Sequence, residues 1–243
     1  MSVQSHAELM DGVYRRQRYI YDFTRKYYLF GRDSLIADLG LKPDESLVEI
    51  GCGTARNLIL IARRYPGARL YGLDASHEML KTARAAVDRA GLSSRITLAH
   101  GYAENLSPAV FGEEKPFDHA IFPYSLSMIP QWKQAFAAAA GAASKIHAVD
   151  FADLTGMGHF GAQAMRAWLA LFHVTPRADI VNAMEHFKAL YPKDEFDLRL
   201  LPGRYAFLLK CDGDLVGRIL VEDVAGQSQQ GGNSDRTAVH RSV

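Results

Sequence analysis

The apolar positions of the chain switch repeatedly between strand-like runs and helical spacing over its middle section. Five short runs are rich in strand-forming residues: 46–51, 68–74, 96–101, 117–124 and 145–151. Between them, apolar residues recur every three or four positions in three segments: 55–65, 76–91 and 131–143. Mostly apolar strands that alternate with helices are typical of a parallel sheet with helices on both faces. Ser76 precedes the second of these helices and is its predicted N-cap.

The pattern changes after the fifth strand. Apolar spacing predicts a helix over 160–173 and another that begins at Pro176, with Thr175 as its cap, and runs to Leu190. Two strand-like runs then surround a Pro-Gly turn within 196–213, which predicts an antiparallel hairpin. The whole pattern therefore predicts an α/β fold with a seven-stranded, mostly parallel sheet whose last strand is antiparallel.

The two ends of the chain differ from this middle part. Residues 13–33 have aromatic and basic residues at helical spacing, and residues 34–42 predict a second short helix. Residues 225–243 lack periodicity and are rich in Gly, Ser and Gln, which is typical of a disordered tail. The predicted organisation has three parts: a helical cap (1–33), an α/β domain (34–224) with a helical insert at about 156–192, and the tail (225–243).

Composition and charge make several classes of protein poor candidates. The chain has 243 residues, 48% of them apolar, and its 28 Lys and Arg nearly balance its 27 Asp and Glu, so no nucleic-acid partner is expected. Cys52 and Cys211 belong to no metal-binding pattern, and no metal is expected. The polar N-terminus lacks a signal-peptide core, which predicts a cytoplasmic protein. A basic stretch from Arg15 to Arg32 leaves peripheral contact with the inner membrane face open, as the sequence does the oligomeric state.

The turn after the first predicted strand carries candidate binding residues. The strand contains Glu49 and breaks into Gly51-x-Gly53, where glycine lets the backbone pass close to a ligand. The third glycine of the GxGxxG dinucleotide fingerprint is missing, so a pyrophosphate clasp is poorly supported. Asp74 ends the second strand, where an acid accepts hydrogen bonds from ribose hydroxyls. These four residues therefore predict a nucleoside ligand without a pyrophosphate.

Four short motifs occur in order, each after a predicted strand: EIGCGTARN, GLDAS, GYAENL and FDHAIFPYSLSM. Together they resemble the motifs of class I S-adenosylmethionine-dependent methyltransferases. The resemblance implies a Rossmann-like fold and S-adenosyl-L-methionine as the cofactor, with Glu49 near its sulfonium and amino end and Asp74 at its ribose. The cofactor-binding set that this resemblance implies is Tyr14, Arg25, Glu49, Gly51, Cys52, Gly53, Asp74, Ala75, Met79, Tyr102, Ala103, Glu104 and Phe122.

Two positions depart from the pattern of that family. Tyr102 stands where the family often has an Asp that accepts a hydrogen bond from the adenine amine. Stacking of Tyr102 on the base, or substitution by Glu104, are the two alternatives there. The usual Pro-Gly-Gly turn before the fifth strand is replaced by AASKI, so that turn must be built differently.

Further motifs resemble a narrower family. YDFTRKYYLFGRD, PYSLSMIPQW, VDFAD and RAWLALFHVTPR are similar to bacterial enzymes that methylate diacylglyceryl-homoserine to a trimethylated betaine lipid. The resemblance implies a lipid amine as the substrate. Aromatic faces bind quaternary ammonium groups, so Tyr21 and Tyr124 are candidates for the acceptor site. His173 is a candidate proton acceptor, and Arg25 a partner for a carboxylate of the cofactor or the head group.

Other functions stay open at this point. A methyltransferase of the same fold that acts on a soluble amine or hydroxyl fits the same motifs. So does a non-catalytic regulator that only binds S-adenosylmethionine. An NAD-dependent dehydrogenase is disfavoured, because the third glycine is absent and no second half of such a fold is evident.

Overall fold

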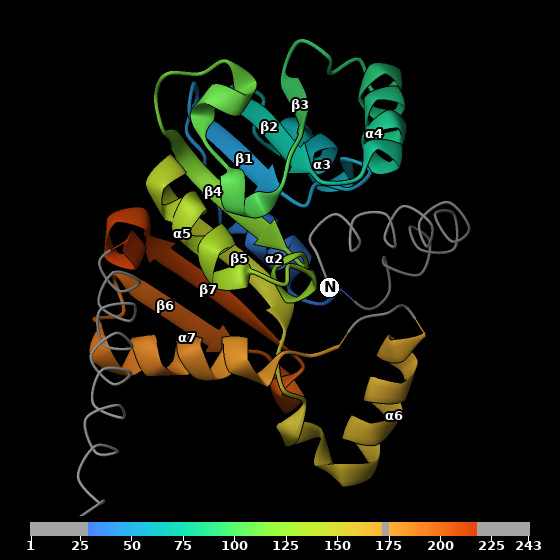
Figure 1. Ribbon diagram of the computed structural model, residues 1–243, viewed down its shortest axis with the longest axis vertical. Helices are drawn as coiled ribbons and strands as arrows, with labels where there is room; N and C mark the ends of the chain where they lie inside the picture. The colour runs from blue at the N-terminus through green and yellow to red at the C-terminus, as the bar shows by residue number, and fades with distance from the viewer. Residues whose placement is uncertain (1–28, 172–174, 218–243) are drawn as a thin grey trace, which may run out of the picture.

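The computed structural model describes residues 29–171 and 175–217, which form a seven-stranded sheet flanked by helices (Figure 1). The strand order is β3-β2-β1-β4-β5-β7-β6. The strands are β1 (Ser46–Ile50), β2 (Arg69–Asp74), β3 (Ile96–His100), β4 (Phe117–Pro123), β5 (Ala143–Phe151), β6 (Phe196–Leu200) and β7 (Ala206–Asp212). The first five are parallel, and β7 runs antiparallel to both β5 and β6. The predicted sheet, with its antiparallel last strand, is confirmed.

β1 lies at the centre of this sheet and is buried along its whole length. It pairs with β2 on one side and β4 on the other. The chain builds outward from β1 to β3 and then crosses back to β4. In open parallel sheets, ligands bind beyond the carboxyl ends of the strands at such a reversal of strand order. The topology therefore places a ligand site where β1, β2 and β4 end.

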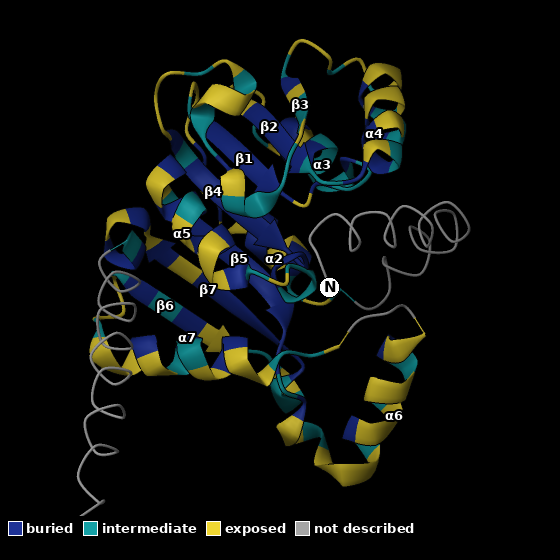
Figure 2. Cartoon of the chain, viewed as in Figure 1, coloured by how far each residue is buried: buried dark blue, intermediate teal, exposed yellow. Residues whose placement is uncertain are grey.

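Helices cover both faces of the sheet (Figure 2). Their bounds are α2 (Arg32–Ala37), α3 (Arg56–Arg64), α4 (His77–Arg89), α5 (Trp132–Ala142), α6 (Gly158–Ala170) and α7 (Ala178–Leu190). α2, α3 and α4 pack into one apolar core, and α5 and α7 pack into the core on the opposite face. α3, α4, α5 and α7 bury their apolar stripes in these two cores, which explains why helical spacing predicted them.

The backbone is not helical at Gly31, although the sequence predicted a continuous helix over 13–33. Gly31 has φ +85°, a left-handed conformation that favours glycine, and α2 begins at Arg32. A Cβ on Gly31 would lie 2.9 Å from Cδ1 of Leu201, so the chain also passes close to the turn between β6 and β7. The rest of the predicted helix, like the predicted tail over 225–243, lies outside the described residues.

The predicted start of the helix over 176–190 is also wrong. α7 begins at Ala178, and Pro176 precedes it. The N-cap residue is Arg177, whose guanidinium donates two hydrogen bonds to Asp179 in the first turn. Asp179 in turn accepts a hydrogen bond of 3.0 Å from Nε1 of Trp132 on α5. Asp179 is thus held both by its neighbour Arg177 and by Trp132, which is distant in the sequence, and the helix starts two residues later than predicted.

Candidate active site

The loop after β1 is tied to the end of β2. The backbone N–H groups of Gly51 and Cys52 both donate to the carbonyl oxygen of Leu73, at 2.8 and 3.0 Å. The N–H of Gly53 donates to Oδ2 of Asp74 at 2.7 Å, and the N–H of Ser76 donates to Oδ1 of Asp74 at 2.9 Å. The Asp74 carboxylate is therefore held in place by backbone from both loops. Two neighbouring strand ends thereby form one rigid corner.

Both glycines of this loop have left-handed backbone conformations, with φ +76° at Gly51 and φ +54° at Gly53. A Cβ on Gly51 would lie 2.6 Å from Cβ of Ser125, so this loop is packed closely against the loop after β4. A Cβ on Gly53 would meet no atom within 4 Å. Gly51 thus brings two loops together, while Gly53 leaves an open side along the backbone.

Glu49 lies below this loop and is 1% exposed. Its Oε1 accepts a hydrogen bond of 2.8 Å from Nδ2 of Asn57 in the first turn of α3. Sequence reasoning did not single out Asn57, although it ends the first motif. The buried Glu49 carboxylate puts negative charge beside the part of the loop that Gly53 leaves open.

The residues expected around an adenine come together at the ends of β2 and β3. Ala75 is half-buried, and its carbonyl oxygen lies 3.1 Å from Nε2 of His100. Met79 is buried on α4, and its N–H donates to the Ser76 hydroxyl at 3.2 Å, which confirms Ser76 as the N-cap. These contacts connect the start of α4 to the end of β3.

The third predicted segment of this corner follows β3. Tyr102 is half-buried, and its ring lies edge-to-face with His100 at 6.3 Å between centroids. Ala103 and Glu104 are also half-buried, in the short helical turn η1 (Ala103–Asn105). The His100 ring stacks on His77 at 3.7 Å, a pair that sequence reasoning missed because the two residues are far apart in the chain.

Two other predicted ligand residues turn their side chains into the core. The sulfur of Cys52 lies 2.9 Å from where a Cβ on Gly72 would stand, and burial raises the pKa of the Cys52 thiol. Phe122 is fully buried and packs on Phe136 of α5, with ring centroids 6.0 Å apart. For these two residues only the backbone remains a candidate for contact with the cofactor.

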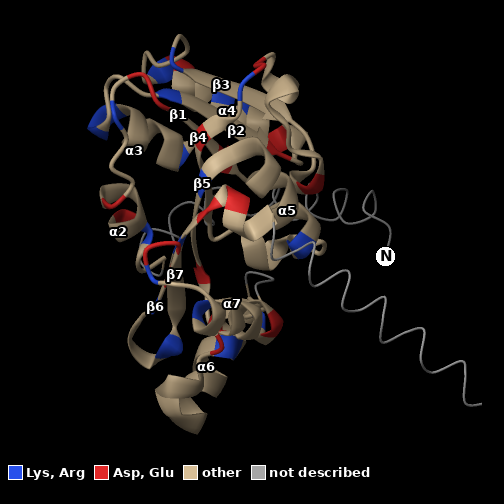
Figure 3. Ribbon diagram, turned by 90° about the vertical axis from the view of Figure 1, so that its left-hand side faces the viewer, with Lys and Arg blue, Asp and Glu red and all other residues tan. Residues whose placement is uncertain are grey.

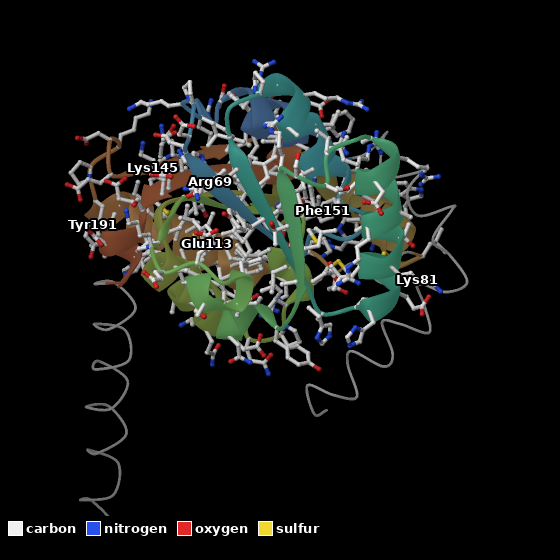
Figure 4. All side chains as sticks on the ribbon, turned by 90° about the horizontal axis from the view of Figure 1, so that it is seen from above. Arg69, Lys81, Glu113, Lys145, Phe151 and Tyr191 are labelled. Carbon is white, nitrogen blue, oxygen red and sulfur yellow. The ribbon has the colours of Figure 1, made fainter. Side chains whose placement is uncertain are left out.

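Tyr124 is buried as well, at the end of β4. Its hydroxyl donates to the carbonyl oxygen of Phe30, and its ring packs edge-on against Phe151 at 4.7 Å. Phe151 lies inside the body of the domain (Figure 4). Tyr124 therefore joins the loop after β4 to the segment that precedes α2. The remaining candidates lie outside the described residues: Tyr14, Tyr21, Arg25 and His173.

A second buried acid, Asp150, stands near the end of β5 and was not singled out from the sequence. It is 1% exposed and accepts hydrogen bonds from the N–H groups of Ser127, at 2.8 Å, and Phe151, at 2.7 Å. Burial raises the pKa of Asp150 to about 6. Its signal in the sequence was an acid inside the apolar run of the fifth strand.

Asp150 and Ser125 fix the loop after β4 at two points. Asp150 holds the short turn η3 (Leu126–Met128) through Ser127. The Ser125 hydroxyl donates to the carbonyl oxygen of Ile50 at 2.6 Å. The three strand ends of the site, on β1, β4 and β5, are thereby connected by hydrogen bonds.

Residues 47–145 match the model of a methyltransferase domain family. The chain carries an S-adenosylmethionine-dependent methyltransferase domain of class I. Among curated relatives, trans-aconitate 2-methyltransferase of Escherichia coli is 27% identical over 99 residues. That match covers 39% of this chain and 39% of the relative, so the chain spans about two fifths of the relative's length.

Solved structures share the fold of this methyltransferase domain. Magnesium protoporphyrin IX methyltransferase from Synechocystis PCC 6803, with bound SAH, matches with a TM-score of 0.59 and 18% identity, over 87% of this chain and 99% of that one. The S-adenosylmethionine-dependent methyltransferase SibL, in its apo form, matches with a TM-score of 0.58 and 17% identity, over 81% of this chain and 58% of that one.

The described residues fit S-adenosylmethionine. When bound, this cofactor supplies a methyl group on a positively charged sulfur. The open space beside Gly53 suits the amino-acid part of the cofactor, which would lie along the backbone. The fixed Asp74 carboxylate suits the ribose hydroxyls. The buried charge of Glu49 suits the cationic end. These roles stay predictions for the individual residues.

The close packing of Gly51 on Ser125 gives a first prediction. We expect Gly51→Ala to lower stability more than Gly91→Ala, because Gly91 also has a left-handed φ, of +69°, but has open space around it. Removing the Ser125 Cβ should relieve the clash. A double-mutant cycle of Gly51→Ala and Ser125→Gly, measured by urea unfolding, should therefore show a favourable coupling of about 1 kcal/mol. Equal losses for Gly51→Ala and Gly91→Ala, with no coupling, would contradict this packing.

The buried Asp150 gives a second prediction, on pH. Its pKa of about 6 exceeds the ordinary value of 3.8, so at pH 5 the folded protein keeps a proton that the unfolded chain has mostly lost. The stability that this group contributes is therefore present at acid pH and is lost as the pH rises through 6. The stability of the native protein minus that of Asp150→Asn should fall by about 1 kcal/mol between pH 5 and 7.5. A difference that rises with pH, or stays constant, would show that the carboxylate is not disfavoured there.

Proposed function

We propose that this protein transfers methyl groups from S-adenosylmethionine to the amine of diacylglyceryl-homoserine and so forms the trimethylated betaine lipid. The observation that carries an amine acceptor is the pair of buried carboxylates Glu49 and Asp150, each 1% exposed, toward the ends of β1 and β5 on either side of β4. In a low-dielectric interior, such charges favour cations. The cofactor carries a cation before transfer, and a methylated amine carries one after it.

The reaction asks little of the protein beyond position and charge. The neutral amine nitrogen forms the new bond to the methyl carbon as the carbon–sulfur bond breaks, and the amine releases a proton. Holding nitrogen, methyl and sulfur in line supplies most of the rate. Asp150 serves as a positioning residue, because it holds the turn after β4 through Ser127.

The arginines near the end of β5 argue against an acceptor with several carboxylates. Arg177 is paired with Asp179 at 2.7 Å. Arg204 is paired with Asp153 at 2.7 Å and with Glu185 at 2.9 Å. An anionic acceptor would have to compete with these carboxylates or find its cations elsewhere. A homoserine head group carries one carboxylate, for which Arg25 is the candidate partner.

A soluble carboxylic acid is the second candidate acceptor. The curated relatives carry the name trans-aconitate 2-methyltransferase, and their similarity to this chain supports that class of molecule. The five basic residues between 15 and 26 would then be the partners of the acid, whereas the lipid proposal uses this segment at a head group and a membrane surface. We place Tyr14 and Tyr21 in this proposal as aromatic contacts of the quaternary ammonium product.

Mass spectrometry of the reaction products separates the two acceptors. The full chain would be incubated with S-adenosylmethionine and either detergent-dispersed diacylglyceryl-homoserine or trans-aconitate, with diacylglycerol as the control that lacks the amine. We expect lipid products heavier by one, two and three CH2 units and none from diacylglycerol. Methylation of trans-aconitate alone would overturn the lipid assignment and keep the transferase. Cofactor binding without either product would overturn both acceptors and keep the methyltransferase domain.

A further inference from the structure

α6 presents an apolar ridge on its outer side. Phe160 is 86% exposed and Leu171, which caps the helix, is 68% exposed. Ala164 and Ala167 lie between them and are exposed as well. The four positions are separated by four, three and four residues, which places them on one face of a helix. The chain thus exposes two large apolar side chains on a single narrow surface, which we call the α6 ridge.

The opposite side of α6 is also apolar and is already used. Ala162 and Leu169 are buried, and Met165 and Trp168 pack partly buried against the core that holds α2 and α3. A helix that is apolar on both sides is usually covered on both sides. The α6 ridge therefore takes no part in the packing of this core.

The charge on α6 excludes some partners. The helix sequence GHFGAQAMRAWLA contains one basic residue, Arg166, and no acid. Arg166 is exposed and donates to the carbonyl oxygen of Asp153 at 3.0 Å. Figure 3 shows α6 at the lower end of the molecule, drawn mostly in the colour of uncharged residues. A surface with this composition suits an anionic or neutral lipid layer better than a basic partner.

The position of α6 relates the ridge to the methyltransferase site. The helix follows β5 and the turn η4 (Thr155–Met157). It therefore starts on the side of the sheet where the parallel strands have their carboxyl ends, and where the Gly51–Asp74 corner lies after β1 and β2. It projects beyond the sheet in Figures 1 and 3. A flat surface that meets the ridge would therefore lie on the side of the molecule at which the carboxyl ends of the strands form the site.

We propose that the α6 ridge docks on a lipid bilayer, with Phe160 and Leu171 inserted at the boundary of head groups and acyl chains. This deepens the proposed function and rests on it, since it says how an enzyme with a lipid substrate reaches that substrate. The contact is one with the surface of the bilayer. Every helix in the described part of the chain is too short or too polar to cross a membrane.

The size of the ridge favours a bilayer over a second copy of the chain. Its ends are eleven residues apart, which corresponds to about 17 Å along a helix. A stable protein interface buries about 800 Å² on each partner and involves some 20–30 residues a side. Four residues on one helix fall well below that. A few apolar side chains are enough for reversible binding to a membrane surface.

Co-sedimentation with vesicles tests the proposal. The full chain would be mixed, without substrate or cofactor, with vesicles of phosphatidylcholine containing a minor fraction of phosphatidylglycerol. We expect Phe160→Ser combined with Leu171→Ser to weaken the partition into vesicles by about tenfold. Leu190→Ser is the matched control, because Leu190 is 59% exposed at the end of α7, and it should leave the partition unchanged. Unchanged thermal unfolding and S-adenosylmethionine binding would show that the double variant is folded.

Several outcomes would overturn the docking surface. One is a native chain that does not sediment with vesicles, and another is equal binding by the double variant and the native chain. A third is a native dimer in sedimentation velocity that the double variant loses, which would assign the ridge to a second copy. Methylation of the lipid in detergent is independent of vesicles. If that reaction proceeds while vesicle binding fails, the docking is wrong and the proposed function stands. If the chain binds vesicles but does not methylate the lipid in detergent, the proposed acceptor is wrong instead.

Discussion

The carboxylate of Asp74 is the point on which the site depends. It accepts one backbone hydrogen bond from Gly53 and one from Ser76, and so fixes the loop after β1 to the start of α4. Without it, the N–H of Gly53 would lose its partner, and the loop would be free to adopt other conformations. The same carboxylate is the predicted partner of the cofactor ribose. One side chain thus shapes the backbone of the site and carries its expected contact with the cofactor.

Most of the fold was predictable, because it rests on local periodicity. The strand runs and the helices between them are long enough for the two spacings to be distinguished, and Ser76 has the chemistry that an N-cap requires. The failures involve contacts between distant segments. Gly31 has a left-handed, non-helical backbone and lies beside Leu201. Asp179, in the first turn of α7, accepts a hydrogen bond from Trp132 on α5, and α7 begins at Ala178 rather than Pro176. The contacts with Leu201 and Trp132 leave no trace in the neighbouring residues.

The candidate site divides in a similar way. Glu49, Gly51, Gly53 and Asp74 were placed by motif, and the structure brings them to one corner. Cys52, Phe122 and Tyr124 were placed by the same motifs, but their side chains point into the core. In strands that are buried on both faces, apolar residues alternate with apolar residues, so the sequence does not show which side chain faces a ligand. Asp150 was missed for a related reason, since a lone acid in a strand has no spacing to interpret.

The most direct test of this account is isothermal titration of the full chain and of Asp74→Ala with S-adenosylhomocysteine, the product form of the cofactor. Asp38→Ala, which removes an exposed acid paired with Arg199, serves as the control. The account predicts binding by the native chain and the control, and an affinity at least about tenfold lower for Asp74→Ala, since both the ribose contact and the fixed loop are lost. Equal affinity for all three proteins would contradict the assignment of Asp74, and with it the central role given to this corner of the sheet.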